Sequence, residues 1–212
     1  MLTEALKPLI VVTGASQGIG AALARVFAEE MRCRLALVAR NEANLEKVAD
    51  DCRAMGAEVA VFCCDVTDAT AVAEMGTSLQ AQLGDVDVLI NNAGLFRPSS
   101  FLDMKVEEFD EMINANLRSL FLVSKELVPA MVERKRGHVF VMSSVAGLNG
   151  YPMGAGYCAA KFGVTGLAKV MREELRESGV RVTIVYPGAT YTPSWDGAGF
   201  PEERMMPAAD VA

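Results

Sequence analysis

The chain has 212 residues, of which 51% are apolar and 22% are charged, and its formal net charge is −7. This length suits a single domain with one sizeable core. Because the chain is acidic and has no basic run, we expect neither nucleic acid nor an anionic membrane as a partner.

Short apolar runs and amphipathic stretches alternate along the chain. Six runs, each about five residues long and rich in β-branched residues, predict strands. These runs are Leu9–Thr13, Leu35–Ala39, Val59–Cys63, Val86–Ile90, Val139–Met142 and Val180–Tyr186. The stretches that predict helices are Ala21–Met31, Glu42–Met55, Asp68–Leu83, Lys105–Arg134 and Ala155–Ser178.

The alternation of these elements predicts the fold class. Continuous apolar runs separated by helices are typical of parallel strands that are buried on both faces. Right-handed crossovers then give a doubly wound sheet with helices on both sides. We therefore predict an α/β fold of the Rossmann type, with three layers and at least six strands in the order 3-2-1-4-5-6. One domain spans residues 1–212, and the segment from Pro187 to Ala212 predicts no clear strand.

A glycine-rich loop with the sequence TGASQGIG, Thr13–Gly20, joins the first strand to the first helix. Such a loop lets backbone N–H groups approach a pyrophosphate, and the N-terminus of the next helix adds a favourable dipole. Gly14 would allow the sharp turn, Gly18 the close approach and Gly20 the tight packing of helix on strand. The spacing is G-x-x-x-G-x-G instead of the usual G-x-G-x-x-G. The loop residues expected to bind a dinucleotide are Gly14, Ser16, Gln17, Gly18 and Ile19.

This loop and four further segments resemble the short-chain dehydrogenase/reductase family, whose loop reads T-G-x-x-x-G-x-G. The resemblance covers the chain from about Pro8 to Thr192 and keeps the order and spacing of the segments. They include NNAG at Asn91–Gly94, YCAAK at Tyr157–Lys161 and PGATYT at Pro187–Thr192. The resemblance implies an NAD(P)-dependent oxidoreductase that acts on a small carbonyl compound or a secondary alcohol.

The end of the second strand distinguishes the two nicotinamide cofactors. An NAD-binding fold has Asp or Glu here for the ribose hydroxyls, but this chain has Arg40 and Asn41 and no carboxylate. Arg40 offers a planar, permanently charged group for a 2′-phosphate, and family members with Arg at this position resemble NADP users. We therefore expect NADP, with NAD as the alternative. Gln17 counts against NADP, because many NADP-preferring relatives have a basic residue in this loop.

The resemblance implies further contacts with the cofactor. Asp65 would accept a hydrogen bond from the adenine amino group. The turn Asn91–Gly94 would lie along the cofactor, where small residues let the backbone approach a ligand. Backbone near Thr190 and the hydroxyl of Thr192 would hold the nicotinamide carboxamide. The residues implied by these segments are Asp65, Val66, Asn92, Ala93, Gly94, Pro187, Gly188, Thr190 and Thr192, with Tyr157 and Lys161 beside the nicotinamide.

Tyr157 and Lys161 stand at positions i and i+4, on one face of the predicted helix. A free phenol has a pKa of about 10, too high for a base at neutral pH, and a nearby ammonium would lower it. Such a pair can exchange a proton with a carbonyl or alcohol oxygen while hydride moves to or from the nicotinamide. We expect the pair at the same edge of the sheet as the glycine loop.

The resemblance adds two residues to the predicted catalytic set. Ser144 would orient the substrate oxygen and stabilise the developing charge, with Ser143 as the alternative. Asn116 lies in the middle of a predicted helix, where Asn is a poor helix former. It would break or bend the helix and bind a water that relays protons to Lys161, with Asn114 as the alternative.

The substrate and the assembly follow less directly from the sequence. Family members usually continue with one more helix and a seventh strand, and Ala208–Ala212 predicts the start of that helix. We therefore expect either a truncated chain or one that lacks these last units. We expect a small carbonyl or alcohol substrate and a homodimer or homotetramer. A catalytically silent dinucleotide-binding sensor and a structural subunit are the alternatives, and the complete Asn/Ser/Tyr/Lys set counts against the sensor. The expected substrate pocket is formed by Leu95, Phe96, Leu148, Tyr151, Met153 and Trp195.

The five cysteines predict free thiols. Their number is odd, and they form no C-x-x-C pair and no Cys/His cluster with the spacing of metal ligands, so we expect no metal and a reducing compartment. Met1–Lys7 lacks the basic start and long apolar stretch of a signal peptide, and Pro8–Val12 is too short to span a membrane. The expected location is the cytoplasm.

Overall fold

The computed structural model describes residues 7–195 and 201–212. At its centre is a six-stranded sheet with the order β3-β2-β1-β4-β5-β6, in which all neighbouring strands are parallel. The predicted fold class and strand order are therefore confirmed. The strands are β1 (Leu9–Thr13), β2 (Arg34–Ala39), β3 (Glu58–Cys63), β4 (Val88–Asn91), β5 (Gly137–Met142) and β6 (Val180–Val185).

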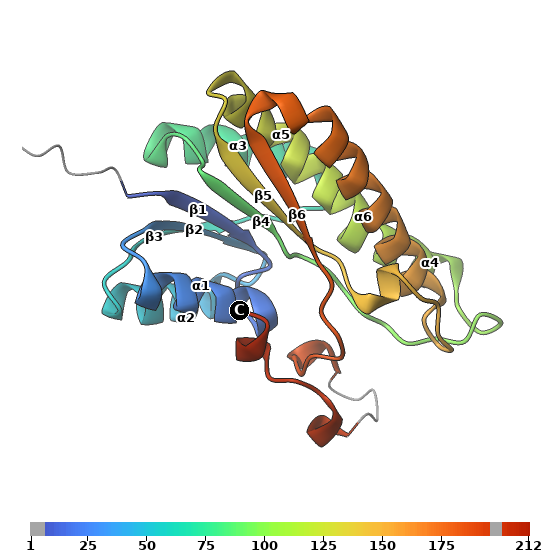
Figure 1. Cartoon of the computed structure of the whole chain (residues 1–212). Helices are drawn as coiled ribbons and strands as arrows, with labels where there is room; N and C mark the ends of the chain where they lie inside the picture. The colour runs from blue at the N-terminus through green and yellow to red at the C-terminus, as the bar shows by residue number, and fades with distance from the viewer. Residues whose placement is uncertain (1–6, 196–200) are drawn as a thin grey trace, which may run out of the picture.

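Helices cover both faces of the sheet and give the fold its three layers (Figure 1). The helices on one face are α1 (Gly18–Glu30) and α2 (Glu42–Ala54). The helices on the other face are α3 (Ala69–Leu83), α5 (Ser119–Glu133) and α6 (Ala155–Glu174), with α4 (Val106–Ile113) packed against α6.

Alternate residues of the central strands enter two separate cores. Leu9 and Val11 of β1 pack on the side of α3 and α5, and Ile10 and Val12 pack on the side of α1 and α2. All four side chains are fully buried. This two-sided burial explains why the strands are continuous apolar runs instead of alternating ones.

The predicted long helix Lys105–Arg134 is interrupted by a π-helical turn, Asn114–Arg118, between α4 and α5. Asn116 lies in this turn and is buried. Its side-chain amide donates to the carbonyl oxygens of Leu95, at 2.8 Å, and Met112, at 2.9 Å. A side chain that competes for backbone carbonyls accounts for the bulge, so the prediction that Asn116 breaks the helix is confirmed.

The segment after β6 adds no strand to the sheet within the described residues. Thr190 forms only an isolated bridge with Met206. The helix predicted to start at Ala208–Ala212 is a single 3-10 turn, η6 (Ala208–Asp210), with i to i+3 hydrogen bonds. Val211 and Ala212 pack against the core on the side of α1 and α2.

Membrane spans, cysteines and metal ligands can each be checked in the described residues. None of the helices in residues 7–195 and 201–212 combines the length and the apolar character needed to cross a bilayer. All five cysteines are free thiols. Over the same described ranges, no group of His, Cys, Asp and Glu side chains is arranged to hold a metal ion. The prediction for Met1–Lys7 falls largely on residues 1–6, which lie outside the described residues.

The hydroxyl of Thr13 joins the two central strands where both end. Thr13 Oγ1 donates to the carbonyl oxygen of Ile90 at 3.3 Å and accepts from the backbone N–H groups of Asn92 and Ala93 at 3.0 and 3.1 Å. Thr13 is 1% exposed, so its hydroxyl is shielded from water. Thr13 therefore satisfies two amides at the point where the chain leaves the sheet.

We expect Thr13→Val to lower the free energy of unfolding by about 1–3 kcal/mol, because a methyl group of the same shape leaves two partly buried N–H groups without this acceptor. Chemical denaturation of the parent and the variant measures the loss. Thr13→Ser keeps the hydroxyl and is the control. If Thr13→Ser were as unstable as Thr13→Val, the threonine methyl group and not the hydrogen bonds would support this junction.

Candidate active site

The carboxyl ends of the strands open onto one large cleft of about 1240 Å³. This volume exceeds the usual range for a single small ligand and leaves room for a dinucleotide together with a substrate. Every residue predicted to bind the cofactor or to act in catalysis lines this cleft. The tertiary structure thus brings together residues that the sequence separates by as many as 178 positions, from Gly14 to Thr192.

The glycine loop forms a tight backbone cradle. Gly14 and Gly18 have φ values of +66° and +56°, in the left-handed region that side chains disfavour. A Cβ atom on Gly14 would lie 2.9 Å from Cα of Ala93, and one on Gly20 would lie 2.3 Å from the carbonyl oxygen of Gly14. Gln17 precedes α1 without a side-chain cap, so the first N–H groups of the helix are available to a phosphate.

Arg40 and Asp65 stand at one end of the cleft, after β2 and β3. Arg40 is 74% exposed, and its guanidinium lies 3.9 Å from the Asp65 carboxylate, a long and weak ion pair that leaves the cation available to an anion. Asp65 accepts hydrogen bonds from the backbone N–H and the hydroxyl of Thr67. Partial burial acts to raise the pKa of Asp65, but the Thr67 bonds and Arg40 outweigh it and lower the pKa.

The turn after β4 connects the glycine loop with Asn116. The side-chain amide of Asn92 donates to the carbonyl oxygens of Thr13 and Gly14, at 2.9 and 3.3 Å. A Cβ atom on Gly94 would lie 2.6 Å from Oδ1 of Asn116, so this contact requires glycine. Because both N–H groups of the Asn116 amide are bonded to backbone carbonyls, they are not available to a relay water.

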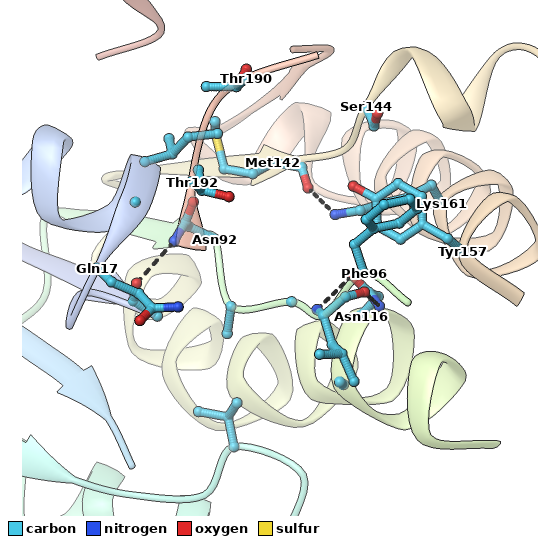
Figure 2. Close-up of a pocket in the computed structure, with 18 of the residues that line it drawn as sticks. Gln17, Asn92, Phe96, Asn116, Met142, Ser144, Tyr157, Lys161, Thr190 and Thr192 are labelled. Carbon is cyan, nitrogen blue, oxygen red and sulfur yellow. Dashed lines mark hydrogen bonds between the residues drawn. The ribbon is translucent and has the colours of Figure 1, made fainter. Parts of the chain in front are cut away.

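Tyr157 and Lys161 lie on the first two turns of α6 and face the cleft together, across from Gln17 and Asn92 (Figure 2). Nζ of Lys161 donates to the carbonyl oxygen of Met142 at 2.8 Å and lies 5.6 Å from the centroid of the Tyr157 ring.

Ser144, just after β5, completes this group. Its hydroxyl accepts from the backbone N–H of Ala146 at 3.1 Å and donates to the carbonyl oxygen of Pro187 at 3.5 Å, and it lies near enough to the Tyr157 phenol to act on its pKa. In this way Ser144 caps the 3-10 turn η2 (Val145–Gly147) and also reaches the phenol.

Burial controls the charge of both side chains. It raises the pKa of Tyr157 to about 12, although the Ser144 hydrogen bond acts in the opposite direction. It lowers the pKa of Lys161, which is 5% exposed, to about 8. The expectation that the phenol pKa is brought down is therefore wrong for this arrangement, because loss of solvation has the largest influence on it. The phenol is protonated at neutral pH, and Lys161 is mostly charged.

Aromatic rings surround the phenol. The ring centroid of Phe96 lies 5.1 Å from that of Tyr157, with the planes at 73°, and 4.7 Å from that of Trp195. Edge-to-face contacts of this kind are favourable and hold the rings in place. Two aromatic rings, Phe96 and Trp195, therefore follow the Tyr157 ring along the cleft wall.

One residue predicted for the substrate pocket lies elsewhere. Leu148 is 49% exposed and is not part of the cleft wall, because the turn η2 directs Val145 there instead. The predicted pocket residues that do line the cleft are Leu95, Phe96, Tyr151, Met153 and Trp195.

Three carboxylates on α4 also line the cleft and were not singled out from the sequence: Glu107, Asp110 and Glu111. Their spacing of three and four residues, continued by Asn114, places them along one side of a helix, and this periodicity is the signal that could have found them. Glu111 is paired with Arg97 at 3.0 Å. This part of the cleft therefore has an acidic wall.

Comparisons with known proteins give the family. A family model described as short chain dehydrogenase matches residues 8–199. The sepiapterin reductase of Chlorobaculum tepidum is 37% identical over 196 residues, which cover 90% of this chain and 80% of that protein. An alcohol dehydrogenase from the archaeon Thermococcus sibiricus, complexed with 5-hydroxy-NADP, has a TM-score of 0.88 at 32% identity. The match covers 97% of this chain and 87% of the dehydrogenase chain. A metagenomic short-chain oxidoreductase in complex with NADP has a TM-score of 0.80 at 41% identity. The match covers 86% of this chain and 82% of that oxidoreductase. The chain belongs to the short-chain dehydrogenase/reductase family and is an oxidoreductase.

Proposed function

We propose that the protein reduces the carbonyl group of a small molecule with NADPH, and that Tyr157 is the general acid. The observation that carries this proposal is the position of Tyr157 and Lys161, which lie together on α6 inside the cleft that the glycine loop also lines. When bound, the nicotinamide supplies the hydride. The reverse reaction, oxidation of a secondary alcohol, uses the same groups with Tyr157 as the base.

The residues of the cleft suit NADP in three places. The glycine loop and the N-terminus of α1 would hold the pyrophosphate, and Asp65 with Val66 would hold the adenine. Arg40 would bind the 2′-phosphate through charge-assisted hydrogen bonds. NADP is supported further by the two similar structures described with NADP or 5-hydroxy-NADP. Asn92–Gly94 and Pro187–Thr192 would hold the nicotinamide half.

Each proposed catalytic side chain has one task. Ser144 orients the carbonyl oxygen and stabilises the charge that develops on it. Tyr157 donates its proton to that oxygen, and the ammonium of Lys161 stabilises the phenolate that remains. Asn116 fixes the backbone of Leu95 and the π-helical turn through its amide N–H groups. A water that relays protons to Lys161 would therefore be bound by Oδ1 of Asn116 or by a backbone group.

The lining of the cleft favours a neutral substrate with apolar or aromatic parts. Phe96 and Trp195 form the wall next to Tyr157, while Glu107 and Asp110 would repel an anion. The names of similar proteins include a sepiapterin reductase and an alcohol dehydrogenase, so they support the reaction class and leave the individual substrate open.

The proposal includes a cytoplasmic location and self-association into a homodimer or homotetramer. Free thiols suit a reducing compartment. Exposed apolar side chains on the outer helices, Phe121 on α5 with Phe162 and Val170 on α6, suit contact between copies of the chain.

We expect Tyr157→Phe to lower kcat by about 10²- to 10⁴-fold, because the acid is lost, while the dissociation constant of NADPH stays the same. A panel of carbonyl compounds, followed by nicotinamide absorbance, measures turnover, and protein fluorescence measures binding. Tyr186→Phe removes a hydroxyl from a tyrosine outside the cleft wall and is the matched control. Full activity in Tyr157→Phe would remove Tyr157 as the acid. NADPH binding with no turnover by the parent would favour a sensor.

Arg40→Asp should weaken NADPH binding by about ten- to a hundredfold and NADH binding far less, because a carboxylate replaces the partner of the 2′-phosphate. Equilibrium titration with both cofactors measures the change. Arg97→Asp is a control with the same change of charge, because Arg97 pairs with Glu111 and does not line the cleft. An unchanged ratio of the two affinities in Arg40→Asp would refute the assignment of Arg40.

Lys161→Met should abolish most turnover and yet raise the free energy of unfolding by about 1–2 kcal/mol at pH 7, because it removes a buried ammonium. Burial lowers the pKa of Lys161 in the folded state from 10.5 to about 8. Between about pH 8 and pH 10.5 the unfolded chain therefore keeps the Lys161 proton that the folded chain has lost, so the free energy of unfolding of the parent rises with pH. Urea denaturation at pH 7 and pH 9.5 without nucleotide measures both. A gain that does not shrink at the higher pH would contradict this interpretation.

A further inference from the structure

Three consecutive residues at the end of β5 each contact α6. Met142 accepts the hydrogen bond from Nζ of Lys161, and the Ser144 hydroxyl lies near enough to the phenol of Tyr157 to act on its pKa. These two contacts hold the proposed catalytic side chains. Ser143 lies between them, and its own contact with α6 has no part in the proposed proton and hydride transfers.

The contact of Ser143 is a buried pair of hydroxyl groups. Its Oγ lies 2.9 Å from Oγ1 of Thr165 and 3.4 Å from the carbonyl oxygen of Lys161. Ser143 and Thr165 are 4% and 5% exposed, so water does not compete for these bonds. Thr165 follows Tyr157 by eight residues and Lys161 by four, which places all three on one side of α6.

The turn η2 closes over this hydroxyl pair. A Cβ atom on Gly147 would lie 2.6 Å from Oγ of Ser143, 2.6 Å from Oγ1 of Thr165 and 2.7 Å from the carbonyl oxygen of Lys161. The end of β5, the turn that begins after Ser144, and α6 therefore meet at one point. A shift of α6 at this point would separate Tyr157 from Ser144.

We propose that Ser143 and Thr165 are positioning residues, whose hydrogen bond fixes the catalytic side of α6 against the end of β5. This rests on the proposed function of Tyr157, Lys161 and Ser144. The two hydroxyls are suited to this task because a buried polar pair is costly to separate, so it defines one position of the helix. Proton transfer depends strongly on that position, since a displacement of about 1 Å can cost a hundredfold in rate.

The first test replaces the Thr165 hydroxyl by a methyl group of the same size. Thr165→Val should lower kcat about tenfold and change the KM of the carbonyl substrate and the dissociation constant of NADPH much less. Thr165→Ser, which restores the hydroxyl, should return kcat to within about twofold of the parent. An unchanged kcat in Thr165→Val, or no rescue by serine, would overturn the proposal.

A matched control separates positioning from general loss of stability. Thr183 on β6 also bonds to a side chain of β5, since its Oγ1 lies 2.8 Å from Nε2 of His138, but it does not line the cleft. Thr183→Val makes the same chemical change and should lower the unfolding temperature without lowering kcat. An equal fall of kcat in Thr183→Val and Thr165→Val would assign the effect to stability.

A double-mutant cycle tests whether the two hydroxyls act as one unit. Ser143→Ala should lower kcat about as much as Thr165→Val does. Because each change removes the same hydrogen bond, the double variant should be no slower than either single variant. Losses that multiply in the double variant would show that Ser143 and Thr165 act separately.

Amide hydrogen exchange tests the position of α6 without turnover. Exchange in residues 155–165 should be faster in Thr165→Val than in the parent and normal in Thr165→Ser. This readout stands even if the parent reduces none of the carbonyl compounds, in which case the proposed function fails and the positioning role is judged alone. Unchanged exchange in Thr165→Val would overturn the positioning role.

Discussion

The site depends on how closely the ends of β1 and β4 approach each other. In the order 3-2-1-4-5-6 these two strands are neighbours, but the chain leaves them toward opposite halves of the sheet, and a crevice opens between the two exits. Thr13 and Asn92 bond the two exits together, and Gly14 has no room for a side chain against Ala93. The glycine loop is therefore placed by contact with the turn after β4 as well as by its own conformation.

Burial gives the two central side chains protonation states that fit reduction. A phenol with a raised pKa keeps its proton at neutral pH, and an ammonium with a lowered pKa is still mostly charged there. The same loss of solvation thus raises the pKa of Tyr157 and lowers the pKa of Lys161, because in each case it disfavours the charged form. In a dry site the field of Lys161 has its largest effect on the phenolate, which forms only after the proton has left.

The junction between β5 and α6 shows how catalytic and structural contacts share one short segment. Of Met142, Ser143 and Ser144, the outer two contact the proposed catalytic pair, and the middle one contacts Thr165. A helix held at three points over two turns has little freedom to slide.

The sequence by itself determined the strand order, the layers and the cofactor and catalytic residues that meet in the cleft. It could do so because these depend on local patterns: apolar runs of strand length, a glycine loop between strand and helix, and a Tyr/Lys pair one helical turn apart. Only the tertiary structure decided the direction of the Tyr157 pKa, the partners of the Asn116 amide, the exposure of Leu148 and the acidic wall on α4. Each of these depends on which groups from other elements surround a side chain and how much water they exclude, and spacing along the chain does not contain that information.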